Sequence, residues 1–163
     1  MSDRESESMS VLEYHVFTKS SPHESFDEMV VLLAQINQEI FSFNETAEHL
    51  LHLFHTKEKI WIVLVTHQHV PIAFKIGFVN QGSSFESWRG GVSPSFRRHG
   101  IAKKLMHMQH AWCQANGIRA IETVVTDGNV AMMTLNIQCG FKVVDTFHNP
   151  KGILKVKMEK QLS

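Results

Sequence analysis

Hydrophobic and polar positions alternate along this chain with two periods, one typical of strands and one typical of helices. Alternating or continuously apolar runs bounded by turn residues predict about seven strands. These strands are expected at residues 11–18, 60–65, 70–79, 85–93, 121–125, 141–146 and 153–159. Apolar residues spaced three and four apart predict four helices, the first with an N-cap at Ser25. These helices are expected at residues 26–40, 46–54, 101–116 and 129–139.

The order of these elements predicts an α/β (α+β) fold. Three consecutive strands between residues 60 and 93 are joined by short turns, which is typical of an antiparallel meander. Residues 85–125 give strand, helix, strand, the order of a right-handed parallel crossover. We therefore expect a mixed, mostly antiparallel sheet with helices on both faces.

A pair of glycines, Gly90 and Gly91, interrupts the strand expected at residues 85–93. Glycine weakens a strand, and inside one it indicates either a bulge or a close approach of another backbone or a ligand. We expect this strand to be irregular or to face a ligand at the two glycines.

The composition bounds the class of protein. A chain of 163 residues with 43% hydrophobic content predicts one domain at residues 10–163, after a polar tail at 1–9 that we expect to be disordered. Sixteen basic and sixteen acidic residues balance, so net charge predicts neither nucleic-acid nor membrane binding. Two cysteines and the lack of a signal peptide or a membrane-spanning run predict a cytoplasmic protein.

Charge is distributed unevenly although it balances overall. Residues 20–56 hold six acids and no Lys or Arg, namely Glu24, Asp27, Glu28, Glu39, Glu45 and Glu48. Residues 88–120 hold six bases and no acid, namely Arg89, Arg97, Arg98, Lys103, Lys104 and Arg119. The first segment suits a cation and the second an anion; ordinary solvated helix faces are the alternative explanation.

The segment Val92–Lys103 has the order of an anion-binding site. An apolar strand ends at Pro94, a basic loop with Arg97 and Arg98 follows, and a helix begins after Gly100. The start of a helix leaves backbone N–H groups unpaired and carries the positive end of the helix dipole, which suits phosphate. A diphosphate would fit this arrangement.

Within this segment, Arg97, Gly100 and Ala102 match the pattern Arg/Gln-x-x-Gly-x-Gly/Ala at a strand-to-helix junction. The chain here resembles the GNAT superfamily of acetyl-CoA-dependent N-acyltransferases. A second element of that family, Asn-x-x-Ala before a Gly-Phe pair, is partly matched by Asn129 and by Gly140-Phe141. The resemblance covers roughly residues 10–160.

The resemblance implies direct attack of a primary amine on acetyl-CoA within a ternary complex. It also implies a splayed central pair of strands that admits the pantetheine arm, with the backbone N–H of Val92 polarising the thioester carbonyl. The acceptor would be a small cationic amine, a lysine side chain or a protein N-terminus, and a homodimer is one possible assembly. The residues expected to bind acetyl-CoA are Gly91, Val92, Arg97, Arg98, His99, Gly100, Ile101, Ala102, Lys103 and Asn129.

Glu86 is the candidate general base. It lies six residues before Val92, an even spacing that puts both side chains on one face of a strand if no bulge intervenes. In the histone-acetyltransferase branch of the family, a catalytic glutamate has this offset from the signature. A bulge at Gly90-Gly91 would reverse the parity, and a surface glutamate beside a turn is the alternative interpretation.

The proton donor departs from the family pattern, because Asn136 stands where many members have a tyrosine. An amide can hydrogen-bond a thiolate but is not a useful acid near neutral pH. The single tyrosine, Tyr14, lies in the first expected strand. Cys139, one turn after Asn136, is either a substitute donor or a buried structural thiol.

The sequence leaves other functions open. No metal is expected, because His49, His52 and His55 follow every third residue and turn the third side chain away from the first. No Walker or Gly-x-Gly-x-x-Gly pattern occurs. The alternatives are a non-catalytic acyl-CoA-binding sensor, transfer of a different acyl group, or a nucleic-acid surface between Arg89 and Arg119.

Overall fold

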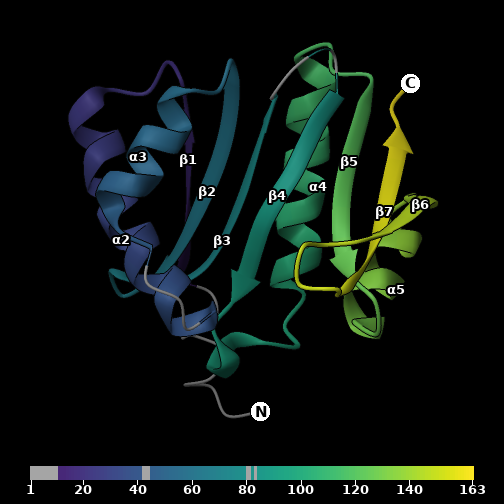
Figure 1. Ribbon diagram of the computed structural model, residues 1–163. Helices are drawn as coiled ribbons and strands as arrows, with labels where there is room; N and C mark the ends of the chain where they lie inside the picture. Colours follow the sequence, from purple (N-terminus) through teal and green to yellow (C-terminus); the bar gives the residue numbers. More distant parts are fainter. Residues whose placement is uncertain (1–10, 42–44, 80–81, 83) are drawn as a thin grey trace.

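The computed structural model describes residues 11–41, 45–79, 82 and 84–163. The tail predicted at residues 1–9 lies outside these described residues. Seven strands form one sheet in the order β1-β2-β3-β4-β5-β7-β6 (Figure 1). The strands are β1 (Leu12–Thr18), β2 (Lys59–His67), β3 (Val70–Val79), β4 (Ser84–Val92), β5 (Ala120–Thr126), β6 (Lys142–His148) and β7 (Leu154–Gln161). Among these strands β4 and β5 pair in parallel and the rest antiparallel, which confirms the mixed, mostly antiparallel sheet.

The helices cover both faces of this sheet, as the sequence predicts (Figure 1). They are α2 (His23–Phe41), α3 (Ala47–His55), the short 3-10 helix η1 (Pro94–Phe96), α4 (Ile101–Ala115) and α5 (Val130–Gln138). Ile62 and Leu64 of β2 pack in the core under α2 and α3, whereas Val63 and Val65 pack in the core under α4. The continuous apolar run of β2 is therefore explained by burial on both faces.

Two helix starts show how local sequence sets the boundaries. Thr46 caps α3, because its Oγ1 accepts the N–H of His49 at 3.1 Å. The prediction that Ser25 caps the first helix is wrong, since α2 already begins at His23. The carbonyl of Pro22 accepts the N–H of Phe26 at 3.0 Å and so closes the first turn earlier.

β4 and β5 form a fork. They are paired only where Ser84–Glu86 faces Ala120–Glu122. Just beyond, the hydroxyl of Thr123 donates to the carbonyl of Ser87 at 3.1 Å. The two ribbons then diverge towards their C-terminal ends (Figure 1). The splayed central pair predicted from the family resemblance is confirmed.

A bulge lies in β4, but not at its two glycines. The register with β3 shifts between Ile76 and Gly77 and leaves Trp88 without a partner in β3. Gly90 and Gly91 pair regularly with Lys75 and Phe74, which excludes a bulge there, one of the two explanations that the sequence leaves open for the glycines. Gly91 instead allows a close approach, because a Cβ atom there would lie 3.0 Å from a methyl carbon of Ile40 in α2.

Candidate active site

The N-terminus of α4 leaves backbone donors free at its first turn. Gly100 caps the helix with φ +77° and accepts the N–H of Lys104 at 3.0 Å. The preceding N–H groups, those of residues 101–103, have no acceptor within the helix. The left-handed φ of Gly100 is strained for any residue with a side chain, which explains the glycine at this point of the signature.

Seven of the residues predicted to bind acetyl-CoA, those at positions 97–103, lie at this helix start. Arg97, Arg98, His99, Gly100, Ala102 and Lys103 are exposed, whereas Ile101 is buried in the core. Ile101 can therefore contribute only its backbone N–H to a ligand. Arg97 also orders the loop, because its Nε donates to the carbonyl of Val92 at 3.0 Å. The basic loop is thereby attached to the open end of the fork.

The edge of β4 that faces the gap carries backbone N–H groups directed away from β3. The N–H of Ser93 bonds to the carbonyl of Ile72 in β3 at 2.7 Å. Because alternate N–H groups of a strand point to the same neighbour, those of Val92 and Gly90 point towards β5. In the described part of the chain, β5 does not pair with either residue. Both N–H groups can therefore serve a ligand in the gap.

Glu86 and Val92 lie on opposite faces of the sheet. Trp88 packs on Phe78 and Arg89 bonds to Asn37 of α2, so two successive side chains point to the α2–α3 face. The bulge at Trp88 thus reverses the parity, and the expectation that Glu86 and Val92 share a face is wrong. Glu86 is directed to the α2–α3 side, and Val92 packs against the core under α4.

The carboxyl group of Glu86 lies at the closed end of the fork, in the last residue pair between β4 and β5. Burial raises its pKa, and the neighbouring carboxylate of Glu122 raises it further, while Lys57 and Lys157 oppose the shift. Glu122 is itself held by Lys157, with 3.4 Å between carboxylate oxygen and ammonium nitrogen. A raised pKa brings a carboxylate closer to the range useful for general base catalysis.

The two asparagines proposed from the family pattern have different surroundings. Asn129 is exposed and caps α5, accepting the N–H of Met132 at 3.3 Å. Asn136 is 2% exposed, and its amide nitrogen lies 3.5 Å from the sulfur of Met158 in β7. The amide group of Asn136 is therefore engaged in the core under α5.

Tyr14 and Cys139 are the two other side chains considered as proton donors. Tyr14 lies on β1, three strands away from β4, with the ammonium of Lys104 over its ring at 3.9 Å. Cys139 is buried next to α5, and its sulfur lies 3.9 Å from Nε2 of His107. The order of the strands thus separates Tyr14 from the fork.

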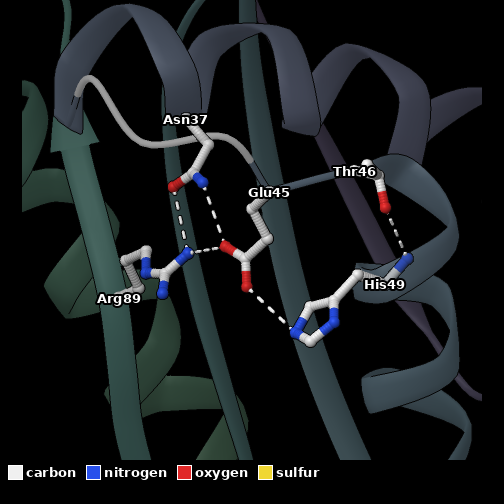
Figure 2. Close-up of polar contacts among 5 residues, drawn as sticks. All are labelled: Asn37, Glu45, Thr46, His49 and Arg89. Atoms are coloured by element: carbon white, nitrogen blue, oxygen red, sulfur yellow. Dashed lines mark hydrogen bonds and ion pairs between the residues drawn. The ribbon is translucent and has the colours of Figure 1, made fainter.

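A polar cluster joins α2, the start of α3 and β4 on the α2–α3 face (Figure 2). The carboxylate of Glu45 forms an ion pair with Arg89, and both bond to the amide of Asn37 at 3.1 Å. His49 lies 3.5 Å from the other oxygen of Glu45. Nearby, Ser93 donates to Glu39 at 3.1 Å. Glu45 and Glu39 therefore hold the helices on β4, and Arg89 does not belong to the anion site.

Sequence reasoning missed two residues near the fork, Thr123 of β5 and Lys75 of β3. Thr123 gives no signal, since threonine is common in strands. Lys75 does give one, because it is the single charged residue in the apolar strand β3. Its side chain lies on the α4 face opposite Gly90, and burial lowers its pKa to about 8.

Neither a metal-binding group of side chains nor a membrane-spanning helix is found among the described residues. Among them, no group of three or more His, Cys, Asp or Glu side chains is placed to hold a metal ion. No helix formed by them is long and apolar enough to cross a membrane.

Comparison with known proteins agrees with this geometry. Residues 3–129 match the family model described as an acetyltransferase (GNAT) domain. The S18-alanine N-acetyltransferase of Escherichia coli, which acts on a ribosomal protein, has a similar fold, with 16% identity and a TM-score of 0.71 over 91% of this chain and 95% of that chain. No curated protein sequence matches this chain.

Two further solved structures share the fold. The PaiA N-acetyltransferase of Thermoplasma acidophilum, in complex with coenzyme A, has 16% identity and a TM-score of 0.69 over 91% of this chain and 99% of that one. NAA60 of Arabidopsis thaliana, in complex with a bisubstrate analogue, has 15% identity and a TM-score of 0.68, and the match covers 90% of this chain and 98% of that chain.

Proposed function

Because the chain belongs to the GNAT family of acetyl-CoA-dependent N-acetyltransferases, we propose that it transfers acetyl from acetyl-CoA to a primary amine by direct attack in a ternary complex. The observation that carries this proposal is the fork between β4 and β5. Its open end leads to the free N–H groups and exposed bases at the start of α4. Its closed end holds Glu86.

The α4 end of the site suits the diphosphate of acetyl-CoA. The N–H groups of residues 101–103 and the side chains of Arg97, Arg98 and Lys103 offer charge and hydrogen bonds together. His99 and Asn129 are exposed and are further candidates for contacts with acetyl-CoA. Gly91, although expected from sequence to contact acetyl-CoA, faces Ile40 on the α2 side, and its N–H points to β3 like that of Ser93, so it offers no free N–H to the gap.

The backbone of β4 suits the pantetheine arm and the thioester. Acetyl-CoA supplies a thioester carbon that is reactive towards amines. The Val92 N–H lies nearest the diphosphate site, but six residues of strand separate it from Glu86, a span of up to about 20 Å. The Gly90 N–H points into the same gap and lies closer to Glu86. We assign Val92 and Gly90 together to the arm and the thioester carbonyl, with Gly90 the deeper donor.

Glu86 acts as the general base in this proposal. Attack on the thioester needs a neutral amine, and the carboxylate can accept the amine proton directly or through water. Because Glu86 faces the α2–α3 side, the acceptor would enter from that side, opposite α4. The proposed acceptor is a small cationic amine, a lysine side chain or a protein N-terminus, as for the alanine named for the E. coli relative.

The test is a pH–rate profile measured by thiol release over a panel of primary amines. We expect Glu86→Gln to lower kcat/KM by about 100-fold and to remove part of the acidic limb. Glu122→Gln should keep kcat but move that limb to lower pH, because the Glu122 charge raises the pKa of Glu86. Glu13→Gln on β1 is the exposed control. An unchanged kcat/KM for Glu86→Gln at every pH would remove Glu86 from the mechanism.

The second candidate is an acyl-CoA-binding sensor without catalysis. The observation that favours it is the position of Asn136, which is buried and turned to Met158. Tight CoA binding with no amine-dependent thiol release across the panel would support the sensor and exclude the transferase.

A further inference from the structure

Lys75 of β3 lies on the α4 face of the sheet, beside β4. It pairs with Val63 of β2 and Gly90 of β4, on the face covered by α4. A Cβ atom at Gly90 would lie 3.5 Å from Cγ of Lys75. The missing side chain at Gly90 therefore leaves room for the lysine stem along β4.

Two groups near α4 and α5 are electrostatically coupled to Lys75. Its electrostatic neighbours are the thiol of Cys139, next to α5, and the ring of His110 in α4. Cys139 and the buried residues of α4 belong to one core on this face of the sheet, so the lysine side chain points to the face that α4 covers. The other charged groups around His110 are His107 of α4 and Lys160 of β7.

Within the described residues, Lys75 takes part in no hydrogen bond or ion pair. The residue is only half-buried, and its Nζ is not among the fully buried polar atoms that lack a partner, so the ammonium keeps contact with solvent. An ammonium without a protein partner is available to a ligand, and groups with a shifted pKa cluster at functional sites. Burial lowers the pKa of Lys75 to about 8, and Cys139 opposes the shift. The group therefore stays mostly protonated at neutral pH but can release its proton easily.

We propose that Lys75 is a catalytic residue that donates the proton taken by the CoA thiolate as it leaves. This inference rests on the proposed function. The C–N bond forms and the C–S bond breaks, Glu86 accepts one proton from the amine nitrogen, and Lys75 gives one proton to sulfur. The products are the acetylated amine and CoA thiol, and both side chains return to their starting states by exchange with water. Lys75 thus fills the role for which Asn136 lacks an acidic proton.

The first measurement needs no acceptor. The thiol pKa of bound CoA is read from thiolate absorbance during a pH titration of the complex. An ammonium beside sulfur favours the thiolate, so the thiol should titrate about one pH unit lower in wild type than in Lys75→Met. Lys142→Met, on exposed β6, is the control and should match wild type. Equal thiol pKa values in wild type and Lys75→Met would overturn the inference.

The second measurement separates charge from proton transfer. Lys75→Met should lower kcat by 10- to 100-fold and remove the basic limb of the pH profile, with the Kd for desulfo-CoA unchanged. Lys75→Arg keeps the charge but cannot give up its proton, so the thiol pKa should stay low while kcat stays reduced. Full activity of Lys75→Met would also overturn the inference. Lys75→Gln, with a polar end, replaces the Met variant if that variant fails to fold.

The two proposals fail in different ways. If wild type releases no thiol with any amine, the proposed transferase activity is wrong, while the thiol titration of bound CoA still decides whether Lys75 faces sulfur. If wild type is active and the thiol pKa is independent of Lys75, only the role of Lys75 is wrong.

Discussion

At the residue scale, packing controls the ionisation of His110. This side chain of α4 is 6% exposed, and Nζ of Lys160 lies 3.0 Å from its Nδ1. Burial lowers the pKa of His110 to about 3, with further contributions from Lys160, Lys75 and His107. The imidazole is therefore neutral in the folded protein near neutral pH, and its Nδ1 accepts a hydrogen bond from the ammonium of Lys160.

The depressed pKa of His110 predicts acid sensitivity. Below about pH 6.5 the unfolded chain binds a proton at this position that the folded chain does not, so stability falls with pH. Between pH 7.5 and pH 5, the free energy of unfolding of wild type should fall by about 2 kcal/mol more than that of His110→Phe. Denaturant titrations at each pH measure this difference. His148→Phe, at an exposed position, is the control and should show the same fall in stability with pH as wild type. If His110→Phe also showed that same fall, the imidazole of His110 would not be neutral in the folded protein.

Single residues of the site differ in how far sequence predicts them. The signature residues Arg97, Gly100 and Ala102 are placed where the pattern indicates, because backbone geometry at a helix start is local. The face of Glu86 is not local, since it depends on a bulge two residues away. The lowered pKa of Lys75 depends on packing with parts of the chain that are distant in sequence.

At the scale of elements, α4 is bounded by two glycines with the same backbone geometry. Gly100 has φ +77° before the helix and Gly117 has φ +73° after it, and a Cβ atom would meet nothing within 4 Å at either. Only the first of these ends carries free N–H groups and a basic loop. Substitutions at the two glycines should therefore cause the same backbone strain, but only a substitution at Gly100 should affect ligand binding.

Alanine at either glycine should cost about 1 kcal/mol of stability, because both backbones are left-handed. Gly100→Ala should in addition raise the Kd for CoA about tenfold, since a shift of the helix start misdirects its N–H groups. Gly117→Ala should bind CoA like wild type. Thermal unfolding and calorimetric titration measure the two effects, and equal Kd values for both variants would contradict a diphosphate site at Gly100.

Element boundaries follow the hydrophobic pattern closely, with instructive exceptions. The strands expected at 70–79 and 121–125 match β3 and β5 within a residue at each end, because their apolar runs are bounded by polar turns. In β4, the two glycines indicate either a bulge or a close approach, and the structure shows the approach of Ile40 at Gly91 and the bulge at Trp88 instead. Sequence gives no signal for Trp88 as the extra residue.

At the scale of the whole molecule, the Glu45–Arg89 pair ties the α2–α3 layer to the sheet (Figure 2). Their side chains are 13% and 19% exposed. Removing one partner leaves a poorly solvated charge, so Arg89→Met should cost about 3 kcal/mol in stability. The double variant with Glu45→Gln should cost clearly less than the sum of the two single variants. Denaturant unfolding of all four proteins measures the coupling, and strict additivity would show that the pair does not join the layers.

The fork is also the mechanically weakest connection between neighbouring strands in the described part of the sheet. β4 and β5 are held by three residue pairs and the Thr123 hydroxyl, whereas β2 and β3 share nine pairs. A force that pulls β1 away from β6 should therefore open the sheet first between β4 and β5, before any hairpin unzips. A ligand bonded to the β4 edge and to the start of α4 would connect the two halves of the sheet across this gap. The force needed to unfold the protein would therefore depend on whether a ligand is bound.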